Sequence, residues 1–94
     1  MKILVIEDSV LLADTIAEAL QNENYAVDIA NDGQLGYEHA STGIYDMVIL
    51  DLMLPKMNGY EVLSALRRDG DNVPVLILSA KTEIDDKIQG FTTG

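Results

Sequence analysis

The feature that most constrains the fold is a regular alternation of short apolar runs with segments of helical periodicity. Continuous apolar runs, typical of strands buried on both faces, lie at residues 3–6, 47–50 and 75–78. Segment 25–30 instead alternates large apolar side chains with small or charged ones, which indicates a strand with one weaker face, near a sheet edge. Strands and helices that alternate in this way favour an α/β fold with one parallel sheet and helices on both faces.

Four helices are predicted between and after these strands. Ser9 can cap the first helix, and the second follows the turn at residues 31–33. The third ends with Arg67 and Arg68, whose charges suit a helix C-terminus, and the fourth spans residues 83–89. The apolar spacing predicts that the first and third helices bury seven residues: Leu12, Ile16, Ala19, Leu20, Val62, Leu63 and Leu66.

The most apolar strands are expected at the centre of the sheet, which gives the strand order 2-1-3-4. In open α/β sheets, ligands bind beyond the carboxyl ends of the strands, where the strand order reverses. That point lies between the first and third strands here. Glu7, Asp8 and Asp51 are therefore predicted to meet there, with Ser79 beside them at the end of the fourth strand.

A site of this kind points to chemistry with a divalent cation. Three crowded carboxylates repel one another, and a cation among them removes that repulsion. Oxygen ligands select a hard ion such as Mg²⁺, and a carboxylate held beside it can attack a phosphoryl group. Asp51 is the candidate nucleophile, because Ser79 can hydrogen-bond a phosphoryl oxygen. The competing interpretation is that Glu7, Asp8 and Ser9 are helix-capping residues only.

Charge and composition argue against several classes of function. The 94 residues include 6 basic and 16 acidic side chains, a net charge of −10, so this chain is not expected to bind nucleic acid or a membrane surface. The absence of cysteine fits a cytoplasmic location. The length suits one domain, spanning residues 1–94. His39, the only histidine, has no ligand-type neighbour one helical turn away and is predicted to lie on the surface.

Three stretches of the chain resemble the receiver domain of bacterial two-component response regulators. They are residues 5–8 (VIED), 48–59 (VILDLMLPKMNG) and 75–81 (VLILSAK). The Asp-Leu-Met-Leu-Pro-x-Met-x-Gly pattern of the second is highly specific, and the resemblance covers the whole chain. It implies a flavodoxin-like three-layer sandwich. The Leu-Met-Leu-Pro segment of the second stretch and the Gly-Phe-Thr-Thr-Gly segment at residues 90–94 are similar in sequence to those of transcription factors that carry a winged-helix DNA-binding domain.

The resemblance also implies roles for the acidic residues. Asp51 would accept a phosphoryl group from a histidine kinase. Asp8, Asp51 and the backbone carbonyl of Met53 would bind Mg²⁺, and Glu7 would act through a water molecule.

Further residues match the family around this site. Ser79 matches the switch hydroxyl that contacts the phosphoryl group, with Ala80 next to it, and Pro55 and Gly59 would set the geometry of the loop after Asp51. The family also has a fifth strand, which bears a lysine, and a fifth helix. This chain ends at Gly94, so we expect a C-terminally incomplete domain whose apolar run 75–78 forms an exposed edge and favours self-association or segment exchange.

Three functions stay open at this point. The favoured one is a phosphoacceptor signalling module, with at most self-phosphorylation and self-dephosphorylation activity, that switches a DNA-binding output outside this chain. The alternative is an interaction or dimerisation module without efficient phosphotransfer. An aspartyl phosphohydrolase is the weakest, because Met53 stands where that enzyme class carries its second acid.

Overall fold

The computed structural model describes residues 1–78 of the chain. Four strands and three helices alternate along it: β1 (Lys2–Ile6), α1 (Val10–Asn22), β2 (Ala26–Ala30), α2 (Gly33–Ala40), β3 (Met47–Asp51), α3 (Gly59–Arg68) and β4 (Val75–Leu78). Each predicted strand is present within one residue of its expected bounds. The predicted helix at 83–89, like Ser79 and Ala80, lies outside the described residues.

All strands pair in parallel, in the order β2-β1-β3-β4 that the apolar pattern predicts. β1 lies at the centre, where Leu4 is in register with Asp28 of β2 and with Val48 of β3. β2 lies at one edge, and its partly exposed side chains explain why its sequence alternates. Within residues 1–78, β4 pairs with β3 alone. This is the flavodoxin-like strand order, and it places the ends of β1 and β3 side by side.

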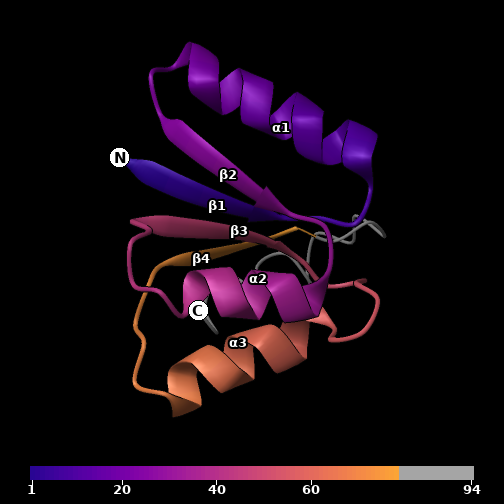
Figure 1. Cartoon of the computed structure of the whole chain (residues 1–94), viewed down its shortest axis with the longest axis vertical. Coiled ribbons are helices and arrows are strands. Elements are labelled where there is room, and N and C mark those ends of the chain that lie inside the picture. Colours follow the sequence, from indigo (N-terminus) through magenta and orange to yellow (C-terminus); the bar gives the residue numbers. More distant parts are fainter. Residues whose placement is uncertain (79–94) are drawn as a thin grey trace.

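The helices cover both faces of the sheet, α1 on one and α2 with α3 on the other (Figure 1). Successive residues of β1 point to opposite faces, because side chains alternate along a strand. Leu4 and Ile6 belong to the core under α2 and α3, whereas Ile3 and Val5 belong to the smaller core under α1. This two-sided burial holds the acidic residues that follow β1 in a fixed position.

The inward face of α1 differs from the prediction. Leu12 is 45% exposed and Ala19 is exposed as well, whereas Ala13 and Ala17 are buried. Ile16 is partly buried against the same core, as is Leu20. The reason is that the small alanines let α1 approach the sheet closely, so the helix turns the larger Leu12 toward solvent. For α3 the predicted inward residues Val62, Leu63 and Leu66 are all buried.

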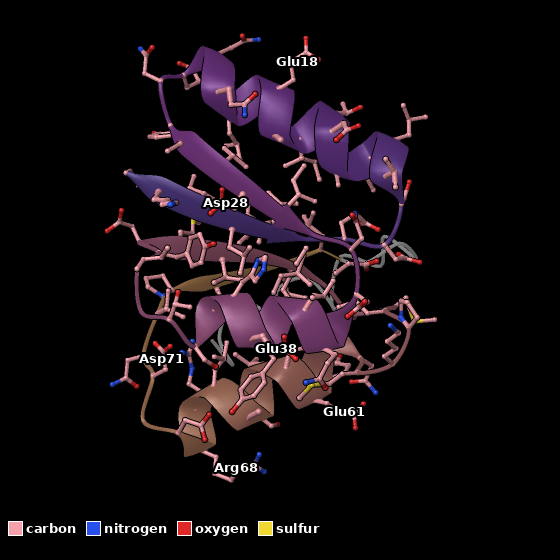
Figure 2. All side chains as sticks on the ribbon, viewed as in Figure 1. Glu18, Asp28, Glu38, Glu61, Arg68 and Asp71 are labelled. Carbon is pink, nitrogen blue, oxygen red and sulfur yellow. The ribbon has the colours of Figure 1, made fainter. Side chains whose placement is uncertain are left out.

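Charged side chains lie on the outer faces of the helices. Figure 2 shows Glu18 on the side of α1 away from the sheet and Arg68 near the far end of α3. None of the helices in residues 1–78 has the length and apolar character needed to cross a membrane.

Candidate functional site

Three carboxylates meet at the carboxyl edge of the two central strands. Glu7 and Asp8 follow β1 directly, and Asp51 is the last residue of β3. One carboxylate oxygen of each lies within 4.8 Å of those of the other two. Glu7 is 4% exposed and Asp51 is 5% exposed, whereas Asp8 faces solvent. The strand order thus brings together the acids that the sequence places more than forty residues apart.

Hydrogen bonds orient two of these carboxylates. The Ser9 amide donates to Oε2 of Glu7 at 3.0 Å, and the Met53 amide donates to Oδ1 of Asp51 at 3.3 Å. Oγ of Ser9 accepts from the Leu12 amide at 3.2 Å and so caps α1. The capping interpretation therefore accounts for Ser9. It does not explain why Asp51, the last residue of β3, lies beside Glu7 and Asp8.

The electrostatics of this cluster favour a bound cation. Burial raises the pKa of Glu7 from its usual 4.5 to about 7. The hydrogen bond from the Ser9 amide opposes this rise in the pKa, and the neighbouring Asp8 and Asp51 reinforce it. Excess negative charge in a partly buried place, with oxygen as the only donor atom type, suits a hard divalent cation.

The loop after Asp51 is held close to the strand by a glycine. The Gly59 amide donates to the Leu52 carbonyl at 3.0 Å. A Cβ atom on Gly59 would lie 2.4 Å from the Asp51 carbonyl oxygen and 2.6 Å from Cα of Leu52. No other residue fits without moving the backbone next to Asp51.

Of the other residues expected at the site, Met53 and Pro55 lie in the described part of the chain, whereas Ser79 and Ala80 do not. Met53 is 58% exposed, and its backbone amide contacts the carboxylate of Asp51. Pro55 lies in the same loop, and its carbonyl accepts from the Met57 amide at 2.7 Å. Ser79 and Ala80 fall outside residues 1–78, so their expected contacts stay predictions.

Asn31 lies near the site but was not predicted from the sequence as a site residue. The Asn31 side chain donates from Nδ2 to the Glu7 carbonyl at 2.9 Å. The sequence marked residues 31–33 only as a turn. A signal was available, because β2 is parallel to β1 with Ala30 opposite Ile6, and the residue after β2 therefore lies beside Glu7.

The prediction for His39 was wrong in part. Its side chain is half-buried, and within the described residues its Nδ1 atom is buried without a hydrogen-bond partner. The physical reason is that α2 packs against β1 and β2 and also against its neighbour α3, so its solvent-facing side is limited to residues such as Gln34, Leu35 and Glu38.

A family model confirms the resemblance. The response regulator receiver domain matches residues 3–94. Among curated proteins, the transcriptional regulatory protein DltR of Streptococcus agalactiae is 43% identical over 94 residues, which are 100% of this chain and 42% of DltR. The transcriptional regulatory protein PcoR of Escherichia coli is 41% identical over 93 residues, 99% of this chain and 41% of PcoR. The chain therefore spans less than half the length of these relatives.

Solved structures agree with the fold. The receiver domain of the Francisella response regulator 1452 superposes with a TM-score of 0.89 at 32% identity, over 99% of this chain and 77% of that one. The chemotaxis protein CheY4 of Vibrio cholerae superposes with a TM-score of 0.83 at 29% identity, over 99% of this chain and 79% of that one.

Proposed function

Because the chain belongs to the response regulator receiver domain family, we propose that it is a phosphoacceptor signalling module in which Asp51 takes a phosphoryl group from a histidine kinase. The observation that carries the proposal is the meeting of Glu7, Asp8 and Asp51 within 4.8 Å. Glu7 and Asp51 are both buried, and each carboxylate accepts a hydrogen bond from the backbone amide two residues later. Of these two, Asp51 is proposed as the acceptor because it is the residue that matches the phosphoacceptor in the family pattern.

The residues at the site fit Mg²⁺. Asp8, Asp51 and the Met53 carbonyl would hold the ion, and Glu7 would act through a bound water. The ion, when bound, supplies positive charge beside the oxygens of the transferring phosphoryl group.

In the transfer itself, a carboxylate oxygen of Asp51 attacks phosphorus. The bond between phosphorus and the histidine nitrogen breaks, and the imidazole keeps the electron pair. The product is an aspartyl phosphate, and neither oxidant nor reductant is required. Ser79, with Ala80 beside it, would hydrogen-bond a phosphoryl oxygen of this product.

The phosphorylated state would switch a transcriptional output. DltR and PcoR are transcriptional regulatory proteins, of which this chain spans about two fifths. DNA binding would belong to the remainder of such a regulator, since a chain with a net charge of −10 repels phosphate backbones. A regulator of transcription that meets a histidine kinase would work in the cytoplasm.

Incubation with a small phosphodonor and Mg²⁺, followed by intact-mass measurement, tests the proposal. We expect the wild-type chain to gain one phosphoryl group and Asp51→Asn to gain none. Asp14→Asn, which changes an exposed acid of α1, is the matched control and should react like the wild type. Modification that persists in Asp51→Asn, or that is unaffected by removing Mg²⁺ with a chelator, would contradict the proposal.

We also propose self-association through β4 as a second property of the chain. Within residues 1–78, the outer edge of β4 has no partner strand. The strand is apolar along its whole length, with Val75 and Ile77 buried, and an unpaired apolar edge is a template for pairing with another chain.

A further inference from the structure

The segment that joins β2 to α2, residues 31–33, contacts both halves of the acidic site. On one side, Asn31 Nδ2 donates to the Glu7 carbonyl at 2.9 Å, at the end of β1. On the other, the Gly33 amide donates to the Pro55 carbonyl at 3.4 Å, in the loop that follows Asp51. We call residues 31–33 the α2 junction. It links these two parts of the site in addition to the direct pairing of β1 with β3.

The loop that the α2 junction contacts contains a strained turn. Lys56 has φ of +68°, which is uncommon for any residue other than glycine. The Met57 amide donates to the Pro55 carbonyl, two residues earlier, at 2.7 Å. That bond around a central residue with positive φ is a γ-turn of the rare, strained kind. Such a turn persists only when its surroundings hold it in place.

Contacts from the α2 junction supply that support. Gly33 lies so close to the loop that a Cβ atom there would be 1.5 Å from the Met57 carbonyl oxygen. Oδ2 of Asp32 lies 3.6 Å from Nζ of Lys56, while its Oδ1 accepts from the Leu35 amide at 2.8 Å and so caps α2. The backbone approach at Gly33 is the stronger constraint, because the Lys56 ammonium is largely solvent-exposed and a surface ion pair contributes little.

We propose that the α2 junction positions the acidic site: Asn31 holds the chain at Glu7, and Gly33 holds the strained turn that fixes the loop carrying Met53. These are positioning residues, since neither would touch the cation or the phosphoryl group. The inference rests on the proposed function, because it assumes that the cation binds among Glu7, Asp8, Asp51 and the Met53 carbonyl.

The Mg²⁺ dissociation constant of the purified chain, measured by titration followed by NMR, tests the inference. Gly33→Ala forces the loop away from α2, and Asn31→Ala removes the hydrogen bond to Glu7. Loss of a partner that orients a metal ligand typically weakens binding by about tenfold or more, and we expect about tenfold for each variant. Gln34→Ala, an exposed change on the same helix, should bind Mg²⁺ like the wild type.

A second measurement, made without Mg²⁺, separates positioning from general destabilisation. Hydrogen exchange of the Met57 amide should quicken in Gly33→Ala, because the turn that protects it relaxes, while amides at the centre of β1 keep their protection. An increase at all amides alike would mean that the substitution only destabilises the fold, and would overturn the role of Gly33. Should Gly33→Ala fail to fold, Asn31→Ala decides the inference, because its side chain is exposed and tolerates truncation.

The outcomes distinguish the inference from the proposed function. A wild-type chain that does not bind Mg²⁺ would overturn the proposed function. A wild-type chain that binds Mg²⁺, with variants that bind it equally well, would overturn the inference alone.

Discussion

At the scale of the residue, Glu7 illustrates the conflict between stability and function at the acidic site. Its carboxylate is buried beside Asp8 and Asp51, and burial raises its pKa to about 7. The folded state therefore favours the protonated carboxyl, so the stability of the metal-free fold falls as the pH rises from about 4.5 to about 7, and the full cost is present above pH 7. Burial of charge is commonly retained at functional sites, where it costs stability.

We expect Glu7→Gln to stabilise the metal-free chain by about 1 kcal/mol at a pH above 7, because it removes the buried charge. The amide oxygen of the glutamine can still accept the hydrogen bond from Ser9. Urea unfolding with and without Mg²⁺ measures the effect. Excess Mg²⁺ should reduce or reverse the gain, since the ion then stabilises the wild type more.

Asp8→Asn is the matched comparison for this prediction. Asp8 is exposed, so its charge is already solvated and the gain in free energy of unfolding should be smaller. A metal-free Glu7→Gln chain that is less stable than the wild type would show that the buried charge of Glu7 does not lower the free energy of unfolding.

At the scale of the element, a polar cluster ties the segment before β3 to the edge strand β2. The Tyr45 hydroxyl donates to Oδ2 of Asp28 at 2.7 Å, and Nζ of Lys2 lies 3.5 Å from the same oxygen. Figure 2 places Asp28 on the sheet, away from the ends of β1 and β3. The Lys2 ammonium also lies 5.7 Å from the centre of the Tyr45 ring. The cluster therefore links β1, β2 and the segment before β3 without contacting the acidic site.

This cluster predicts an alkaline dependence of stability. Burial, with the hydrogen bond to Asp28, raises the pKa of Tyr45 from its usual 10 to about 12. A raised pKa means that the folded state favours the neutral phenol, so the contribution is complete below pH 10 and is lost as the pH rises through 12. We expect Tyr45→Phe to lower the free energy of unfolding by about 1 kcal/mol at neutral pH. Its stability should also fall less steeply than that of the wild type across this alkaline range.

Denaturant unfolding as a function of pH measures both effects. Tyr60→Phe is the control, because Tyr60 is 56% exposed and its removal should change little. Identical alkaline profiles for the wild type and Tyr45→Phe would contradict the assignment.

The elements differ in how well the sequence predicts them. Continuous apolar runs such as residues 3–6 predicted the strands and their order, because a short run of this kind is typical of a strand that is buried on both faces and therefore central in the sheet. The inward face of α1 was predicted correctly for Ile16 and Leu20 but wrongly for Leu12. Leu12 and Ala13 both fit a helical spacing, and only packing against the sheet decides between them. The meeting of Glu7, Asp8 and Asp51 followed from strand order. The contact between Gly33 and the turn at Lys56 depends on distances of a few ångströms that no sequence pattern encodes.

At the scale of the whole molecule, the edge of β4 determines how the chain associates. The Pro74 carbonyl accepts from the Val48 amide of β3, and the Leu78 carbonyl accepts from the amide of Leu52, the residue after β3, so the backbone groups of the residues between them alternate in direction. Those of Val75 and Ile77 therefore point away from β3, and those of Leu76 point toward it. We expect the 94-residue chain to dimerise at micromolar concentration, since burial of an apolar edge acts at short range and salt screens the repulsion between acidic chains.

Sedimentation together with hydrogen exchange tests this expectation. The Val75 and Ile77 amides should exchange more slowly as the protein concentration rises, whereas the Leu76 amide, already bonded to β3, serves as an internal control. A monomer at all concentrations, with unchanged exchange at Ile77, would exclude pairing through this edge.

The central position of β1 has a consequence for the synthesis of the protein. Of the four described strands, β1 is synthesised first, yet its two neighbours are β2 and β3, and β3 ends at residue 51. Residues 3–6, at most 1% exposed in the folded chain, thus wait for 45 further residues (51 − 6) to be made. At 5–20 residues per second this takes roughly 2–9 s, during which the most apolar segment of the nascent chain is without its final partner. Substitutions that slow the docking of β3 should therefore increase aggregation and chaperone demand during translation before they change the behaviour of the finished protein.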